Sequence, residues 1–416
     1  MPVTCNDILS QGARLHDAGR LEEALNLYDS AMENCRDAVG LWNNRGNTLL
    51  ALCRYGEAVE SYNHALMLMP GLHDARVALA TCLQALGHTD EALTACQAVL
   101  SQAPDHAEAH WNRALLLLLN GEYNEGWREY EWRWRKRGFT SPLRTFVQPR
   151  WQGEDIRGKT LLIHAEQGFG DTLQFCRYIP LLVEQGIRVV FECHPPLTAL
   201  MGTLTDSIQV VPMGRPLPPF AWHIPLLSLP QVCNTTLDTI PARTPYLQVP
   251  PDRRPFWASV VPHDSRLRVG LCWAGKSYPD PNRSISPASL EPLSAIPNIH
   301  WFSLQIGPAS SLPTPLPLTD LTSQILDFGD SAALVEHLDL VITIDTAVAH
   351  LAAALGKETW VMLPFAPDWR WLLVRDDSPW YPGMRLFRQA LRGVWGGTVE
   401  QVARELGNVA DHAQPH

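Results

Sequence analysis

The sequence contains no Cys-x-x-Cys motif and no apolar run of membrane-spanning length, and its first residues do not have the pattern of a leader segment. Its nine cysteines, scattered from Cys5 to Cys272, include no Cys-x-x-Cys pair and no metal-ligand spacing, which predicts reduced thiols in the cytoplasm. The run ALLLLL at 114–119 is too short to cross a bilayer, so we expect a buried helix there. The first twenty residues lack a basic segment followed by an apolar one. The sequence therefore predicts neither a signal peptide nor an integral membrane segment.

Basic charge is also scarce. The formal net charge is −10, and no long run of lysine and arginine is present, so we expect no nucleic-acid partner. Hydrophobic residues make up 46% of the 416 residues, which is enough for well-packed cores. A chain of this length predicts two or three domains.

The first third of the chain repeats with a period of 34 residues. Small residues recur where two helices must approach closely, and large ones recur where the next unit must be filled. The best unit, at 42–70, resembles the tetratricopeptide repeat, whose concave face usually holds a peptide or protein. The repeated columns are Ile8, Trp42, Arg76 and His110; Gly12, Gly46, Ala80 and Ala114; Ala24, Ala58, Ala92 and Gly126; and Tyr28, Tyr62, Cys96 and Tyr130.

The fourth unit departs from this pattern because Trp127, Trp132 and Trp134 lie close together. Terminal repeats are often atypical, so we expect a capping repeat whose aromatic rings pack on the next domain. The alternative is an aromatic platform that binds a ligand.

From about residue 159, apolar strands alternate with helical segments. This order predicts a parallel sheet covered by helices on both faces. A proline-rich stretch at 241–262 interrupts the alternation, which restarts at 267. We therefore predict an α plus α/β fold, with a repeat solenoid followed by two Rossmann-like lobes and a cleft between them. The predicted domains are 1–140, 141–255 and 256–416.

The first strand of this region leads into HAEQGFGDTLQF at 164–175, where we expect a helix to begin at Asp171. Three interpretations are open. A dinucleotide turn would need a third glycine where Leu173 stands, although Glu192 lies where a ribose-binding acid would be. Asp171 alternatively caps its helix. In the third interpretation it is a general base at the edge of the sheet where open α/β folds carry their ligands.

The second lobe contains VITIDTAVAHLAAALG at 341–356. Small side chains at the start of a helix let an anion approach the backbone N–H groups, and Thr346 adds a hydroxyl. His350 lies one turn further on, near the same side of the helix. Lys276 and Arg283 follow an earlier strand and can neutralise a diphosphate without a metal ion. The phosphate site is therefore predicted in this lobe.

Both motifs resemble a known family. GFGDTLQFCRYIPLL resembles the G-D-x-x-x-x-x-P-x-L opening of the heptosyltransferase-like glycosyltransferases, and the 341–356 segment resembles their D-T-G-x-x-H-L-x-A-A-L signature. The whole chain resembles bacterial tetratricopeptide-repeat proteins with such a domain (glycosyltransferase family 9/41-like), and is similar in plan to the protein O-linked N-acetylglucosamine transferases. The resemblance implies a GT-B fold, a nucleotide-sugar donor, and no metal or other cofactor.

The resemblance also assigns residues. Asp171 matches the proposed catalytic base, and Arg283 best matches the family's phosphate-binding lysine, with Lys276 second. These roles imply an inverting single displacement, in which the base takes the acceptor's proton and the diphosphate leaves. The family's donor-phosphate segment matches Asp345, Thr346, Ala347 and His350, with Ala347 in place of a glycine.

Further contacts and partners follow less directly from the sequence. The expected partners are a nucleotide sugar and a protein or peptide acceptor chosen by the repeats, in the cytoplasm. The alternatives are a non-catalytic scaffold or nucleotide-sugar sensor, and a transferase for a lipid-linked or polysaccharide acceptor. The possible sugar or acceptor contacts are Glu166, Gln167, Gly168, Gly170, Asp368, Trp369 and Arg370.

Overall fold

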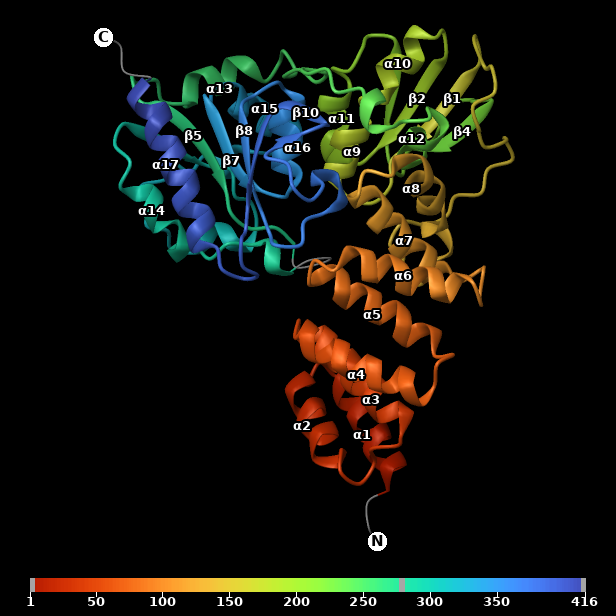
Figure 1. Ribbon diagram of the computed structural model, residues 1–416. Helices are drawn as coiled ribbons and strands as arrows, with labels where there is room; N and C mark the ends of the chain where they lie inside the picture. Colours follow the sequence, from red (N-terminus) through yellow and green to blue (C-terminus); the bar gives the residue numbers. More distant parts are fainter. Residues whose placement is uncertain (1–3, 277–280, 413–416) are drawn as a thin grey trace. The chain divides into compact units, whose positions relative to one another are not determined.

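The computed structural model describes residues 4–276 and 281–412, and the chain divides into two compact units, 1–139 and 140–416. The first unit consists of helices joined in consecutive antiparallel pairs (Figure 1). This arrangement confirms the repeat solenoid that the sequence period predicts. The helices are α1 (Cys5–Asp17), α2 (Leu21–Ala31), α3 (Val39–Ala51), α4 (Tyr55–Leu68), α5 (His73–Ala85), α6 (Thr89–Leu100), α7 (Ala107–Leu119) and α8 (Tyr123–Tyr130).

The glycine and tyrosine columns of the repeat pack against each other. A Cβ atom at Gly12 would lie 2.3 Å from the ring of Tyr28, and one at Gly46 would lie 2.7 Å from the ring of Tyr62. Tyr28 and Tyr62 are fully buried. The 34-residue period therefore records a physical pairing, in which the absent side chain on one helix leaves room for the ring on the next.

We expect Gly46→Ala to lower the free energy of unfolding of the repeat unit by about 1–3 kcal/mol, because its methyl group must displace a buried ring. The ring is held in place by the hydrogen bond from the Tyr62 hydroxyl to Asn47 Oδ1, at 2.8 Å. Gly56→Ala is the matched control, since a Cβ atom there meets no atom within 4 Å. Urea unfolding followed by far-ultraviolet circular dichroism measures both. Equal stability of the two variants would contradict this packing account.

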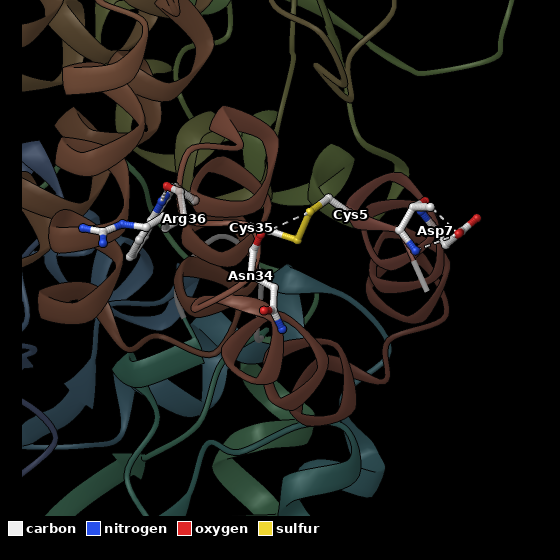
Figure 2. The surroundings of a disulfide bond; sticks show 7 residues. Cys5, Asp7, Asn34, Cys35 and Arg36 are labelled. Atoms are coloured by element: carbon white, nitrogen blue, oxygen red, sulfur yellow. Dashed lines mark hydrogen bonds between the residues drawn. A yellow bond between two sulfur atoms is a disulfide. The ribbon is translucent and has the colours of Figure 1, made fainter. Parts of the chain in front are cut away.

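The prediction that all cysteines are free thiols is wrong for one pair. Cys5 and Cys35 form a disulfide, which Figure 2 shows in its surroundings. The antiparallel pair α1–α2 brings the beginning of α1 beside the turn after α2, so residues 30 positions apart become neighbours. Spacing motifs such as Cys-x-x-Cys cannot reveal such a pair. The other cysteines that the structure describes are free.

The apolar run at 114–119 lies in α7, and Leu116 to Leu119 are buried as expected. Among the residues that the structure describes, no helix has the length and apolar character needed to span a membrane. In the tryptophan-rich segment, Trp127 contacts Tyr123 edge-on, with ring centroids 5.3 Å apart. Trp132 stacks on His110 at 3.8 Å. Packing of these rings on the next domain stays a prediction.

The second unit contains two sheets. In the described residues 140–276, the parallel strands β1 (Thr160–His164), β2 (Arg188–Cys193), β3 (Ile208–Pro212) and β4 (Trp222–Pro225) lie in the order β3-β2-β1-β4. The helices associated with this sheet are α9 (Phe169–Phe175), α10 (Tyr178–Glu184), α11 (Thr198–Met201) and α12 (Leu229–Val232). Their alternation with helices agrees with the predicted order of elements after residue 159.

The second sheet has the order β6-β5-β7-β8-β10-β9, parallel except for its last pair. Its alternating strands and helices confirm the predicted α/β class, consistent with two Rossmann-like GT-B lobes. The strands are β5 (Leu267–Cys272), β6 (Ile299–Ser303), β7 (Leu340–Ile344), β8 (Thr359–Leu363), β9 (Asp377–Ser378) and β10 (Tyr381–Arg388). The helices are α13 (Arg254–Val260), α14 (Glu291–Ser294), α15 (Phe328–Glu336), α16 (Ala347–Ala354) and α17 (Gly396–His412).

The helix after β1 begins earlier than predicted, and it is short. It begins at Phe169 rather than at Asp171, with Gly168 as its N-cap. It also ends at Phe175, and a separate helix follows from Tyr178. Pro180 explains the break, because its ring lacks the N–H that a continuous helix would need and clashes with the preceding turn. The break places Arg177 between the two helices, where it is buried.

Candidate active site

The glycine turn after β1 holds Asp171 by its backbone. The N–H of Gly168 donates to Asp171 Oδ2 at 2.8 Å, which is the hydrogen bond of a helix cap. Gln167 adopts a left-handed conformation with φ of 61°, and its N–H donates to Ser141 Oγ at 2.7 Å. The helix-cap interpretation of Asp171 is thus confirmed for one carboxylate oxygen.

The second oxygen, Asp171 Oδ1, pairs with the guanidinium of Arg370, which comes from the other sheet's side of the unit. Arg370 also donates to Gln174 Oε1 at 2.6 Å and to Asp368 Oδ1 at 2.9 Å. Its guanidinium lies 4.3 Å from the ring centroid of Trp369. Arg370 therefore holds the Asp171 carboxylate in this conformation.

Burial raises the pKa of Asp171 above its ordinary value, and the charge of Asp368 adds to the increase. The charge of Arg370 and the N–H of Gly168 oppose it. A carboxylate with these neighbours has a higher proton affinity than an exposed aspartate. A raised proton affinity favours a role as a general base.

The dinucleotide interpretation of this turn receives no support. Glu192, the expected ribose-binding acid, is buried and ion-paired with Arg144. The N–H of Gly168, which a pyrophosphate would need, already binds Asp171. An anion at this turn would therefore meet a carboxylate instead of free N–H groups.

The second half of the site is the start of α16. Thr346 is its N-cap, and its Oγ1 accepts from the N–H of Val348 at 3.3 Å and lies 3.2 Å from Thr343 Oγ1. Ala347 is the first helical residue, so its methyl group lies beside the N–H groups at the helix start. A helix start with small side chains is suited to bind an anion.

Arg283 lies against this helix start. Its guanidinium donates to the backbone oxygen of Asp345 at 3.3 Å and to that of Lys276 at 2.9 Å. A Cβ atom at Gly275 would lie 3.1 Å from Arg283 Nε and 3.2 Å from Thr346 Cγ2, so a side chain there would crowd both. Lys276 is exposed. The rest of the predicted loop, residues 277–280, lies outside the described residues.

The two helix starts meet. A Cβ atom at Gly170 in α9 would lie 3.0 Å from His350 Cδ2 and 3.7 Å from Ala347 Cα in α16. Figure 1 shows α9 beside α16. Gly170 is thus explained by the close approach of the segment that carries Asp171 to the segment that carries Thr346 and His350.

Asp345 links the two halves electrostatically. Burial raises the pKa of Asp345 to about 6, and the charge of Asp368 adds to the increase. The charges of Arg370 and Arg283 act in the opposite direction. A carboxylate that is partly protonated near neutral pH repels a nearby phosphate less than an ionised one does.

Two of the predicted substrate contacts, Glu166 and Trp369, are buried. Glu166 is 3% exposed, and its Oε1 accepts from the N–H of Leu227 at 3.2 Å. Trp369 is also 3% exposed. Their predicted contacts with the sugar or acceptor stay predictions.

Sequence reasoning missed Gln305, which follows β6. Its Oε1 accepts from the backbone N–H groups of Trp273 and Ala274, at 3.1 and 2.8 Å, and its Nε2 donates to the Ala274 oxygen at 3.1 Å. Gln305 thereby holds the loop that leads to Gly275. Its place at the carboxyl end of a strand is the signal that could have found it.

The described residues contain no group of three or more histidine, cysteine, aspartate or glutamate side chains arranged to hold a metal ion. The positive charges of the site are those of Arg283 and Arg370, together with the partial positive charge at the start of α16. The expectation that no cofactor is needed stays a prediction.

Comparisons with known proteins match both parts of the chain. The tetratricopeptide-repeat family model matches residues 49–116, and the glycosyltransferase family 9 (heptosyltransferase) model matches residues 319–360, which include β7 and the start of α16. The chain thus combines a tetratricopeptide-repeat region with a region similar to the heptosyltransferase glycosyltransferases. The glycosyltransferase match supports glycosyl transfer as its activity.

One curated relative of this chain is protein FlbA of Caulobacter vibrioides. It is 29% identical over 432 aligned positions, which cover 95% of this chain and 72% of the relative. Among solved structures, MamA is 18% identical with a TM-score of 0.30, covering 32% of this chain and 77% of that one. A tetratricopeptide-repeat protein of Thermus thermophilus is 21% identical with a TM-score of 0.29, covering 30% and 71%.

Proposed function

We propose that this chain transfers a sugar from a nucleotide-sugar donor to a nucleophile on a protein or peptide, by an inverting single displacement that needs no metal ion. The observation that carries the proposal is the meeting of the two helix starts. The carboxylate of Asp171 stands at one, and the anion-binding group of Thr346 and Arg283 stands at the other, with Gly170 at the contact.

Each step has a candidate residue. Asp171 takes the proton of the attacking nucleophile, and its raised pKa suits that task. The leaving diphosphate gains negative charge, which Arg283 and the N–H groups at the start of α16 stabilise. Among the candidate cations, Arg283 is preferred over Lys276 because hydrogen bonds fix its guanidinium at the helix start.

The acceptor proposal rests on the repeat unit. A stack of helix pairs offers a concave surface without chemistry of its own, and such surfaces usually bind peptides or proteins. We infer that the repeats select the acceptor, so that the transferase domain modifies a protein. A cytoplasmic location belongs to the same proposal.

Incubating the purified full-length chain with a panel of nucleotide sugars in excess EDTA tests this function. We expect one donor to be turned over, with inversion of the anomeric configuration seen by proton NMR. Dependence on a divalent ion added back after chelation would contradict the metal-free mechanism. Thermal stabilisation by a nucleotide sugar without any turnover would favour the sensor.

Arg283→Ala is expected to weaken binding of the nucleoside diphosphate product about tenfold or more, because a charge-assisted hydrogen bond to phosphate is lost. Lys276→Ala is the matched comparison and should weaken binding less, since its side chain is exposed. Isothermal titration calorimetry measures both. A larger effect at Lys276 would reverse the assignment.

Arg370→Gln is expected to shift the acidic limb of the pH–rate profile to higher pH. Arg370 lowers the pKa of Asp171 against the effect of burial, so its removal leaves the base protonated at a higher pH. Arg385→Gln is a control, because its ion pair is with Glu405 in α17, 3.1 Å away. The dependence of kcat/KM on pH measures the shift. An unchanged acidic limb would show that Arg370 does not set the pKa of the catalytic base.

A further inference from the structure

Four buried or partly buried polar side chains form a hydrogen-bonded row that ends at His350, at the contact between α9 and α16. Arg177 Nη2 donates to the Tyr246 hydroxyl at 3.0 Å, and the hydroxyls of Tyr246 and Tyr381 are 3.4 Å apart. The Tyr381 hydroxyl lies 2.9 Å from His350 Nδ1. Arg177 lies in the break after α9, and Tyr246 lies in the proline-rich stretch. Tyr381 begins β10, and His350 lies in α16. Of the four, only His350 belongs to the signature at 341–356.

Arg177 supplies a charge to this row. Its side chain is buried, and no carboxylate among the described residues is within ion-pair distance of it. The guanidinium donates instead to the backbone oxygens of Trp380, at 2.6 Å, and Gln174, at 2.8 Å. It also lies 4.4 Å from the ring centroid of Tyr381. A buried positive charge with only neutral acceptors polarises the hydroxyls beside it.

The hydrogen positions follow from the acceptors. The Tyr246 hydroxyl donates to the backbone oxygen of Leu173 at 2.8 Å, since a carbonyl can only accept, and it accepts from Arg177. The single hydrogen of Tyr381 has two possible acceptors, His350 Nδ1 at 2.9 Å and the Tyr246 oxygen at 3.4 Å. The shorter contact is the hydrogen bond with the better geometry. This distance fits donation by Tyr381 to an unprotonated Nδ1, and the tautomer measurement below tests it against donation from a protonated Nδ1 to Tyr381.

A neutral imidazole that accepts at Nδ1 carries its hydrogen on Nε2. The ring stays neutral because burial, with the charges of Arg370 and Arg177, lowers the pKa of His350 well below its ordinary value. The ring is 4% exposed and stacks on Trp371, with centroids 5.5 Å apart. Among the described residues Nε2 has no hydrogen-bond partner, and it is not one of the fully enclosed polar atoms.

We propose that Arg177, Tyr246 and Tyr381 are positioning residues that fix His350 as its Nε2–H tautomer, so that it presents one neutral N–H to the diphosphate of the donor. The proposal rests on the proposed function. Nε2 lies 3.6 Å from the place of a Cβ atom at Gly170, which is where the two helix starts meet. A neutral N–H binds a phosphate oxygen without repelling Arg283.

Two substitutions of His350 distinguish its nitrogens. The side-chain amide nitrogen of glutamine reaches roughly the position of Nε2, whereas that of asparagine reaches roughly the position of Nδ1. ADP, GDP, CDP and UDP are titrated against each full-length variant in EDTA by calorimetry. We expect His350→Gln to bind the preferred diphosphate within about threefold of the unmodified chain, and His350→Asn to lose about tenfold or more. Equal losses, or no loss in either, would overturn the proposal.

Nitrogen NMR of the chain labelled at its histidines measures the tautomer without a ligand. We expect His350 to have an unprotonated Nδ1 and a protonated Nε2. Tyr381→Phe should move the Nδ1 resonance, whereas Tyr178→Phe should not, since that buried hydroxyl bonds Thr235 at 2.8 Å outside the row. A protonated Nδ1 would overturn the proposal. If no diphosphate binds the unmodified chain, the proposed function fails, and the resonances still decide the tautomer.

Discussion

Asp171→Asn should lower the rate of sugar transfer about 10²–10⁴-fold, the usual contribution of a general base. The substitution keeps the size of the side chain but removes its ability to accept a proton. Donor binding should persist, because the proposed phosphate contacts are in the other half of the site. Single-turnover transfer with a radiolabelled donor measures the rate.

The variant also weakens a helix cap, so it needs a control with the same structural loss. Asp327→Asn serves, since Asp327 caps α15 through the N–H of Gly329, at 2.8 Å, and pairs with Arg253, at 3.1 Å. Both variants keep a side-chain oxygen that can cap the helix and lose the charge of an ion pair, so we expect small stability losses of similar size. Only Asp171→Asn should lose transfer. Near-normal transfer by Asp171→Asn would reduce Asp171 to a cap.

Deleting residues 1–104 should abolish modification of the natural acceptor while sparing donor hydrolysis or transfer to a small surrogate. The reason is that the helix pairs offer a binding surface, whereas all proposed chemistry lies in residues 166–370. The cut leaves α7 and α8 with their tryptophan-rich segment in place. The rates at which the intact and truncated chains modify the natural acceptor and the small surrogate measure the effect.

The truncated chain exposes a repeat face and can aggregate, so circular dichroism and gel filtration must show that it is folded and monodisperse. A folded truncation that modified the natural acceptor as fast as the full chain would make the repeats a stability or assembly element. The acceptor argument would then fall, and the transferase proposal would remain.

The parts of the fold that the sequence predicts are those with a strong local pattern. Buried parallel strands such as β1 and β7 are continuous apolar runs, and each is followed by a helix. β10 was not predicted, because Pro382 and Gly383 interrupt it, and its pairing with β8 supplies what the local sequence lacks. α13 was missed because the proline-rich stretch hides it.

In the candidate site, too, residues with a local sequence signal could be predicted and contacts between distant residues could not. Thr346 and Asp171 follow strand ends, so their positions could be predicted. The ion pair of Asp171 with Arg370 joins residues 199 positions apart, and no spacing rule reveals it. Tyr246 and Tyr381, 135 positions apart, carry no local signal either. Contacts of this kind depend on how the two sheets come together.

A crystal structure with the preferred nucleoside diphosphate bound would test the central claim most directly. The account predicts the diphosphate at the start of α16, with Arg283, Thr346 and His350 Nε2 on its oxygens and its free end directed toward Asp171. A diphosphate bound at the glycine turn of Gly168 and Gly170 instead would contradict it.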